Sequence, residues 1–245
     1  MNTVIFLDLD NTVMRNPFES AVFPRIARQM SDQGSVTPQQ ARDAINDEFF
    51  RRMAPDSHCP PALVFDWDDI VTTVAESLHI GGITPLHLLV EEYAHAPYVQ
   101  ILDAADRVLH EMRRPWRKLI AATNGLSKYQ VPVLDALDLT CQFDGFLSPD
   151  TTGALKGWKA FYEGAMSPGA CAVSIGDSYA QDIVGPKELG MWTIWVRNGT
   201  TTFSPDIPTD SSAADYVVEN FHQVPALIDE IESSTACTTP RRSEI

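Results

Sequence analysis

The sequence predicts an α/β fold, a doubly wound parallel sheet that carries an inserted all-helical domain. Short apolar runs, each about as long as a strand, lie at 3–9, 118–123, 171–175, 191–196 and 215–218. Most of them are apolar throughout, which is typical of parallel strands covered by helices on both faces. The second observation is that helical patterns separate these runs, and this alternation favours a doubly wound sheet.

The first two strands are separated by a segment too long for a single crossover connection. It has almost no strand signal, and helical patterns lie near 18–33, 38–53, 67–79 and 84–95, with a proline-rich break at 54–62. The helices expected to cover the sheet lie near 98–114, 157–165, 179–189 and 220–232. We therefore expect an α/β core of residues 1–14 and 97–232, a helical domain of residues 15–96, and a disordered polar tail, 233–245.

The composition limits the kinds of partner. The chain has 245 residues, 44% of them hydrophobic, which is enough for a substantial core. With 18 basic and 33 acidic residues its net charge is −15, so its field repels nucleic acid polymers and anionic membranes. An anionic substrate would therefore need positive charge supplied locally, by a metal or by particular Lys and Arg side chains. The sequence does not indicate an oligomeric state.

The cysteines and the N-terminus indicate a cytoplasmic protein. The four cysteines are far apart and form no C-x-x-C pair, so we expect reduced thiols and neither a zinc site nor a disulfide framework. The first apolar run is too short for a signal peptide or a membrane span, and no basic segment precedes it.

Two aspartates end the first predicted strand. Asp8 and Asp10 follow the apolar residues 4–7, and side chains at positions i and i+2 of a strand point to one face, about 6.6 Å apart. At the carboxyl end of a parallel strand they face the crevice in which α/β folds bind ligands. Two such carboxylates repel each other unless a cation or a proton separates them. The alternative is that Asp10 and Asn11 only cap the next element.

A second acidic pair follows the strand at 171–175. Gly176 allows a tight turn, Asp177 comes next, and Asp182 lies five residues further on. If this strand neighbours the first, four carboxylates share one crevice, and such oxygen ligands suit Mg²⁺. Asp177 as a helix N-cap is the simpler interpretation, but a cap does not exclude metal binding.

Weaker signals lie between these pairs. The strand at 118–123 ends in Thr123, followed by Asn124 and Gly125, and the hydroxyl and loop N–H groups of such a turn can hold phosphate oxygens. Asn-Gly turns are, however, frequent for structural reasons alone. A lysine follows at Lys156, with Lys159 as the competing candidate.

Together these motifs resemble the haloacid dehalogenase (HAD) superfamily, in order and in spacing. The first motif, D-x-D-x-T, matches residues 8–12; the second matches Thr123; the third matches Lys156; the fourth, G-D-x(4)-D, matches residues 176–182. The resemblance implies a Rossmann-like core over about 3–14 and 97–219 and a helical cap domain where the insertion lies. Many members have proline after the third-motif lysine, whereas Gly157 follows here. We assign Lys156, and Lys159 remains the alternative.

The resemblance implies a role for each acid. Asp8 would be the nucleophile that forms an aspartyl-phosphate, and Asp10 the general acid and base. Mg²⁺ would be bound by the Asp8 carboxylate, the Asp10 backbone carbonyl and Asp177, with Asp182 holding its water or orienting Lys156. The metal would make the close acids tolerable and let an anionic nucleophile approach a phosphate.

The remaining motif residues would bind the substrate. Thr123, the Asn124 backbone and Lys156 would stabilise charge on the phosphoryl oxygens. The cap would close over the core and select the substrate.

Candidates for that selection are Arg15, Arg51 and Arg52, whose alternative is a solvated helix face. Phe65 and Trp67 are aromatic candidates for stacking on a ring, whose alternative is core packing.

The function expected from these residues is a Mg²⁺-dependent phosphatase that acts on a small phosphorylated metabolite, of the nucleotide, sugar phosphate or phosphoglycolate type. A 2-haloacid dehalogenase is the main alternative; it needs neither a metal nor a second acid, so Asp10 favours the phosphatase. A phosphate mutase, or a catalytically silent binding protein on the same fold, remains open.

Overall fold

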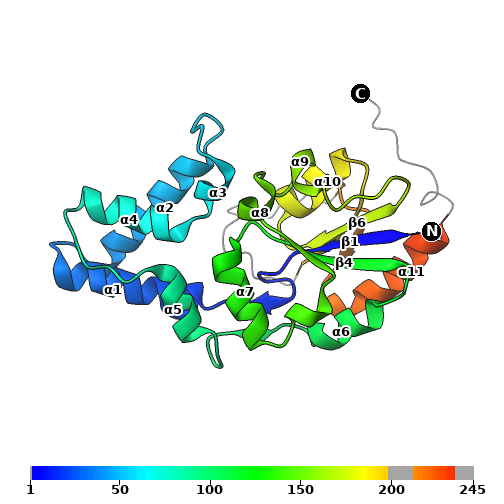
Figure 1. The fold of residues 1–245 in the computed structure, drawn as a ribbon, viewed down its shortest axis with the longest axis horizontal. Helices are drawn as coiled ribbons and strands as arrows, with labels where there is room; N and C mark the ends of the chain where they lie inside the picture. Colours follow the sequence, from blue (N-terminus) through cyan, green and yellow to red (C-terminus); the bar gives the residue numbers. More distant parts are fainter. Residues whose placement is uncertain (1, 198–211, 235–245) are drawn as a thin grey trace. The chain divides into compact units, whose positions relative to one another are not determined.

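The computed structural model describes residues 2–197 and 212–234. These residues form two compact units (Figure 1). The α/β unit contains the residues up to Arg15, Ile101–Asn124, and the residues from Leu139 onward; the helical unit contains Asn16–Gln100 and Gly125–Asp138. The helical unit thus includes residues 125–138, which the sequence suggested for the core. The functional division into a catalytic core and a cap stays a prediction.

The α/β unit contains a parallel six-stranded sheet in the order β5-β4-β1-β6-β7-β8. The strands are β1 (Thr3–Leu7), β4 (Arg117–Ala122), β5 (Gly145–Leu147), β6 (Cys171–Gly176), β7 (Trp192–Val196) and β8 (Tyr216–Val218). From β1 the chain adds β4 and β5 on one side and β6, β7 and β8 on the other, so its direction of winding reverses beside β1. The predicted fold class is confirmed, and a doubly wound sheet binds ligands at such a switch point.

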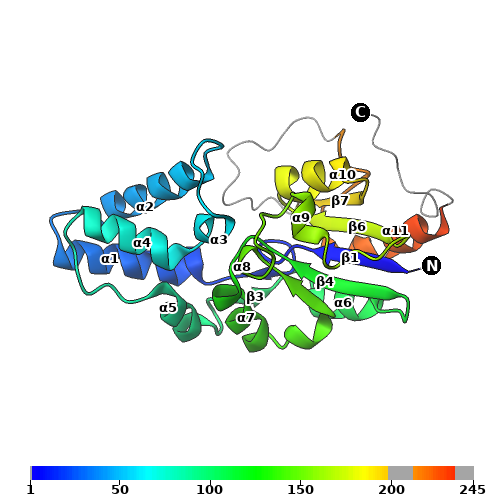
Figure 2. The same ribbon diagram turned by 45° about the horizontal axis from the view of Figure 1, so that its top comes forward.

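Helices cover both faces of this sheet. They are α6 (Ala105–Met112), η2 (Thr140–Gln142), α8 (Pro149–Thr152), α9 (Lys159–Tyr162), η3 (Tyr179–Val184), α10 (Gly185–Glu188), η4 (Phe221–Gln223) and α11 (Val224–Ser233). The side chains of Val4 and Phe6 lie on the same face of β1 and pack in one cluster with residues of α9. There the rings of Phe6 and Tyr162 lie 4.9 Å apart. Helices α6 and α11 pack together on the opposite face from α9 and α10 (Figure 2). Burial on both faces explains why β1 is apolar from Val4 to Leu7.

One predicted element of this unit begins later than expected, and one strand was not predicted. The helix expected over 98–114 begins only at Ala105, after the short strand β3 (Gln100–Ile101), because Asp103 and Ala104 have φ angles of 45° and 53°. Such left-handed residues do not continue an α-helix. Strand β5 was not predicted, because three residues carry too little periodicity. A second short strand, β2 (Met14–Arg15), precedes the helical unit.

The helical unit has a compact aromatic core. Its helices are η1 (Phe18–Val22), α1 (Phe23–Gln33), α2 (Pro38–Met53), α3 (Pro61–Val64), α4 (Trp67–Ser77), α5 (Leu86–Tyr93) and α7 (Ser127–Ala136). Trp67 stacks on Phe49 at 4.9 Å and meets the edge of Phe23 at 4.9 Å, while Phe18 meets Tyr129 of α7 at 5.4 Å. The four long helices of the insertion were predicted, but α7 was not, and Pro132 lies inside it.

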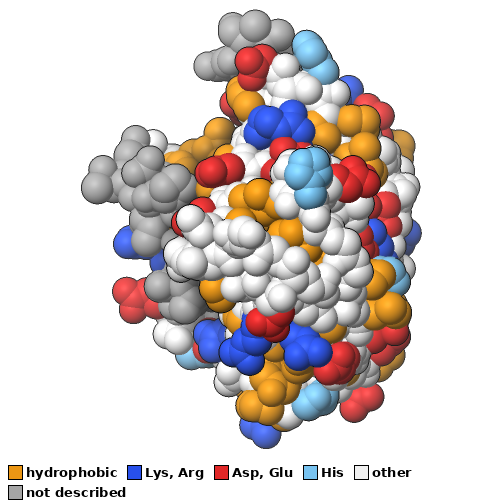
Figure 3. Space-filling view, turned by 90° about the vertical axis from the view of Figure 1, so that its left-hand side faces the viewer, with side chains coloured by type: hydrophobic (Ala, Val, Ile, Leu, Met, Phe, Trp, Pro, Cys, Tyr) orange, Lys and Arg blue, Asp and Glu red, His pale blue; other side chains and the backbone are white. Residues whose placement is uncertain are grey.

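Surface side chains of different kinds lie side by side on the face shown in Figure 3, where acidic, basic and hydrophobic groups are interspersed. Within the described ranges no helix is both long and apolar enough to cross a bilayer.

Cys59 and Cys141 are free, but Cys171 is disulfide-bonded, so the expectation of four reduced thiols is wrong. Of the predicted disordered tail, Ser233 ends α11 and residues 235–245 lie outside the described residues.

Candidate active site

Three neighbouring strands end level with one another, and polar residues follow them. The register pairs Leu7 of β1 with Ala121 of β4 on one side and with Ile175 of β6 on the other. Asp8 follows β1 directly, and its N–H donates to the Ile175 carbonyl at 2.9 Å. Thr123 follows β4 directly. Because the strands are parallel, these residues meet at one edge of the sheet, as the sequence predicts.

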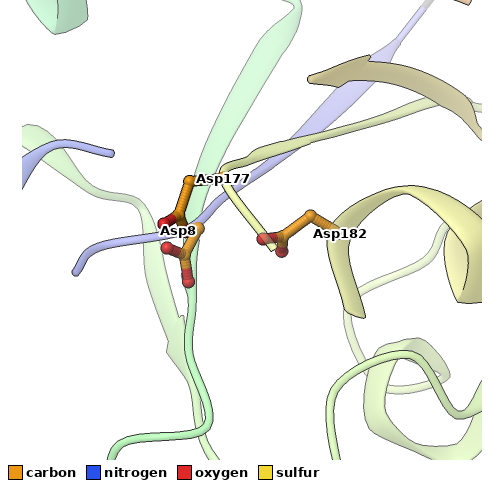
Figure 4. A group of neighbouring side chains, drawn as sticks. All are labelled: Asp8, Asp177 and Asp182. Atoms are coloured by element: carbon orange, nitrogen blue, oxygen red, sulfur yellow. The ribbon is translucent and has the colours of Figure 1, made fainter. Parts of the chain in front are cut away.

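Three buried carboxylates lie together at this edge, those of Asp8, Asp177 and Asp182 (Figure 4). One oxygen atom from each lies within 4.8 Å of the others. Asp182 comes from η3, is fully buried, and accepts a hydrogen bond from the Ser178 N–H at 2.9 Å. Gly176 makes this approach possible, because a Cβ atom there would lie 2.2 Å from an Asp182 carboxylate oxygen.

The cluster holds more negative charge than its surroundings offset. Burial, and then the charges of Asp8 and Asp182, raise the pKa of Asp177 to about 9. Burial also raises the pKa of Asp182 to about 7, with Asp8 adding to the shift and Lys156 opposing it. Three carboxylates thus face a single buried cation among the described residues around them.

A divalent cation fits this donor set. The ligand atoms are hard oxygens from separate carboxylates close enough to share one ion, and the excess of negative charge is of the kind that Mg²⁺ neutralises. Asp10 is half-buried and its carboxylate is not part of this group of described residues. The atom that Asp10 is predicted to offer the metal is its backbone carbonyl oxygen, and the cluster described above consists of carboxylate oxygens only.

The buried cation is Lys156, which is only 4% exposed. Its Nζ lies 2.5 Å from Asp8 Oδ1 and 2.5 Å from Asp182 Oδ1. Burial lowers the pKa of Lys156, but the charges of Asp182 and Asp8 outweigh burial and raise it above its ordinary value, so the ammonium persists at neutral pH. The side chain of Lys159, by contrast, is 78% exposed and lies 3.7 Å from Glu163. The lysine beside the acids is therefore Lys156.

Asn124 and Thr123 are buried beside this cluster. The Lys156 N–H donates to Asn124 Oδ1 at 2.9 Å, so Asn124 supports the loop that carries the lysine. The Thr123 N–H donates to the Leu147 carbonyl at 3.0 Å, which extends the β4–β5 pairing by one residue. Thr12, the last residue of the first motif, donates its hydroxyl to Asp8 Oδ2 at 3.3 Å. Asp8 is thereby held through both carboxylate oxygens.

Comparisons with known proteins agree with these motifs. Residues 158–224 match the HAD-hydrolase-like family. The chain is 27% identical over 182 residues to the human haloacid dehalogenase-like hydrolase domain-containing protein 3, covering 69% of each protein. The solved structure of a HAD phosphatase from Thermococcus onnurineus superimposes with a TM-score of 0.70 at 25% identity, over 93% of this chain and 98% of that one. The chain belongs to the HAD superfamily of hydrolases.

Other HAD relatives differ in the reaction for which they are named. A phosphoglycolate phosphatase from Caulobacter vibrioides is 28% identical over 149 residues, which cover 59% of this chain but only 58% of that protein. The L-2-haloacid dehalogenase from Xanthobacter autotrophicus superimposes with a TM-score of 0.61 over 94% of this chain and 99% of that one. At 17% identity this likeness concerns the fold alone. The choice between phosphatase and dehalogenase therefore has to be argued from the side chains of the site.

Some residues of this HAD site were not predicted from the sequence. Ser178 and Gln181 lie between Asp177 and Asp182 in the fourth motif, so proximity in sequence was an available signal. Trp195 of β7 donates its indole N–H to the Asp177 carbonyl at 2.9 Å. No sequence signal points to Trp195, because β7 becomes a neighbour of this loop only in the folded sheet.

The candidates in the helical unit have mainly structural partners. Arg52 is buried and paired with Glu48 at 2.8 Å and with Asp69 at 2.7 Å, so it joins α2 to α4. Arg51 is exposed and also pairs with Glu48, at 2.7 Å. Trp67 is buried in the aromatic core. Arg52 therefore does not lie on a solvated helix face, the alternative stated for it, because it is buried and paired within this unit. For Trp67 the stated alternative, core packing, agrees with its burial.

Proposed function

We propose that this hydrolase is a Mg²⁺-dependent phosphatase that hydrolyses a small phosphomonoester through a phosphorylated Asp8. The observation that carries the proposal is the pairing of Lys156 with both Asp8 and Asp182 beside a third buried carboxylate, Asp177. In a 2-haloacid dehalogenase the leaving halide is already a stable anion, so that reaction needs neither a metal nor the further carboxylates that lie beside Asp8 here. The relatives named as phosphatases support the same choice.

In the proposed reaction an Asp8 oxygen attacks the phosphorus atom, and the bond from phosphorus to the ester oxygen breaks. Asp10 gives its proton to the departing alkoxide and then takes a proton from the water that releases phosphate from Asp8. Lys156 and the Thr12 hydroxyl keep the Asp8 carboxylate oriented, since each contacts one of its oxygens. Thr123 and the Asn124 backbone bind the phosphoryl oxygens.

Asp8, Asp177 and the Asp10 carbonyl would hold Mg²⁺, which when bound neutralises charge between the nucleophile and the phosphoryl group. Asp182 keeps Lys156 in place, because its carboxylate already binds the ammonium group. We further propose that the protein acts in the cytoplasm, which fractionation of the source cells tests.

The test is a set of phosphate-release assays over nucleotides, sugar phosphates and phosphoglycolate, with Mg²⁺, with Ca²⁺ and with excess chelator. We expect turnover with Mg²⁺, loss in chelator, and poor support by Ca²⁺, whose larger and more flexible shell misplaces the nucleophile. Full turnover in chelator would contradict the metal requirement.

The dehalogenase alternative is tested in parallel with 2-chloropropionate and with Asp10→Asn. Halide leaves without a proton, whereas an alkoxide needs one, so we expect Asp10→Asn to slow an alkyl phosphate by roughly 10²-fold or more. The loss should be smaller for an aryl ester with a good leaving group. Chloride release without phosphate release would replace the phosphatase by a dehalogenase.

A further inference from the structure

The loop that carries Lys156 rests directly on the segment η3–α10. Gly157 has a φ of +94°, and a Cβ atom added to Gly185 would lie 2.7 Å from Gly157 Cα and 2.8 Å from its carbonyl oxygen. The two backbones are therefore in contact with no side chain between them. Contact of this kind sets the distance between loop and segment, but it provides no directional bond that prevents sliding.

Directional bonds come from two side-chain amides. The Lys156 N–H is a donor, so the Asn124 atom that it meets at 2.9 Å must be Oδ1. Asn124 Nδ2 is then a donor, and it lies 2.9 Å from Gln181, whose facing atom must be the acceptor Oε1. The backbone donor of Lys156 thus determines the orientation of both amide groups.

We propose that Gln181 is a positioning residue, which acts through Asn124 to hold the Lys156 loop in register with the acids. Gln181 and Asp182 are consecutive residues of η3. Through Asn124 the first holds the Lys156 backbone, and the second holds the Lys156 ammonium group. The same segment therefore fixes both ends of this lysine. The catalytic value of this arrangement rests on the proposed function, since that function needs Lys156 beside Asp8.

The test replaces the acceptor while keeping the length of the side chain. Gln181→Met removes Oε1, whereas Gln181→Glu retains an oxygen acceptor for Asn124 Nδ2. A matched control is Gln142→Met, the same substitution at a half-buried position of the same unit. Amide hydrogen exchange of Lys156, followed by NMR, reports on its bond to Asn124 without any substrate or metal.

We expect Lys156 N–H exchange to accelerate at least about ten-fold in Gln181→Met and to stay near wild type in Gln181→Glu and Gln142→Met. The indole N–H of Trp195, which donates to the Asp177 carbonyl, should keep its exchange rate in every variant. Unchanged Lys156 exchange in Gln181→Met, or equal acceleration at Trp195, would overturn the positioning role.

Activity gives the second readout. We expect Gln181→Met to lower kcat roughly ten-fold on a generic phosphoester while KM changes less than about three-fold, since the lysine acts in turnover. An unchanged kcat despite faster exchange would overturn the role. If wild type hydrolyses no phosphoester, the proposed function fails, and the exchange measurement still decides whether Gln181 holds this loop.

Discussion

Asp66 and Asp68 in the helical unit are surrounded by hydrogen-bond donors, whereas Asp8, Asp177 and Asp182 in the α/β unit face one another. Asp66 Oδ1 accepts from Lys128 Nζ at 2.7 Å and from the Tyr129 hydroxyl at 2.9 Å, and it also caps α4. These two donors belong to α7, so one carboxylate ties that helix to the unit. Asp8, Asp177 and Asp182 instead lie against one another, and Lys156 pairs with Asp8 and Asp182.

Both carboxylate oxygens of Asp68 also accept hydrogen bonds. Its Oδ1 accepts from the backbone N–H groups of Leu86 and His87 at the start of α5, and its Oδ2 accepts from His87 Nδ1 at 2.8 Å. Lys128 adds an ion pair at 2.9 Å. Burial raises the pKa of Asp68, but Lys128 and His87 outweigh it and hold the pKa below its ordinary value. At Asp177 the balance is opposite, and the pKa is raised.

The difference teaches how to separate structural from functional carboxylates in one chain. A buried acid whose oxygens are all paired stabilises the elements that supply the donors. A buried acid that faces other acids costs stability until a cation or a substrate group is bound, and such costs are typical of functional sites. Four predictions test this distinction, and they follow in order of expected effect.

The largest effect is expected on catalysis. Asp8→Asn should lower kcat/KM by about 10⁴-fold or more, because the nucleophile is lost. Asp68→Asn should leave hydrolysis of a small generic ester within about ten-fold of wild type. Steady-state assays of both variants at equal folded concentration provide the measurement. Similar losses in the two variants would contradict the assignment of Asp8 as a functional carboxylate and Asp68 as a structural one.

The next effect is on stability. Asp68→Ala should lower the free energy of unfolding by about 2–4 kcal/mol, because it removes one of the two carboxylate partners of Lys128 and leaves the first N–H groups of α5 without their acceptor. Asp47→Ala, an exposed aspartate of α2, serves as the control and should change it by less than about 0.5 kcal/mol. Urea unfolding measures both. Equal changes would mean that Asp68 is not structurally special.

An opposite sign is expected in the α/β unit. Without metal, Asp177→Asn should raise the free energy of unfolding by about 1–2 kcal/mol, because a carboxyl whose pKa is raised to about 9 destabilises the fold at neutral pH. Mg²⁺ should raise the Tm of wild type and leave that of the variant nearly unchanged. A destabilised metal-free variant would contradict the excess of negative charge.

The smallest effect is expected on stability at acidic pH. Because the folded-state pKa of Asp68 lies below its ordinary value, its contribution is complete above the unfolded-state pKa, near 4, and is lost as pH falls through the folded-state pKa. The stability difference between wild type and Asp68→Asn should therefore shrink as the pH is lowered from 7 to 3. Unfolding curves at several pH values measure it, and a constant difference would assign the effect to shape rather than charge.

The sequence by itself determined the architecture of the sheet and the position of the acids along it. Residues 4–7 are apolar at every position, and such a run followed by Asp8 and Asp10 indicates a buried strand ending in a crevice, because local periodicity and turn chemistry operate over a few residues. The second acidic motif, after β6, could be placed for the same reason. The parallel sheet and the HAD superfamily followed from these motifs and are confirmed.

Only the tertiary structure decided which side chains meet. Lys156 and Lys159 are three residues apart, and the sequence left Lys159 open beside the assigned Lys156, yet only Lys156 is buried between Asp8 and Asp182, while Lys159 is exposed. Helix α7 joins the helical unit through Lys128 and Tyr129, Arg52 is buried by partners on other segments, and Cys171 is disulfide-bonded. Each outcome depends on contacts between residues far apart in the chain, and local pattern carries no information about such contacts.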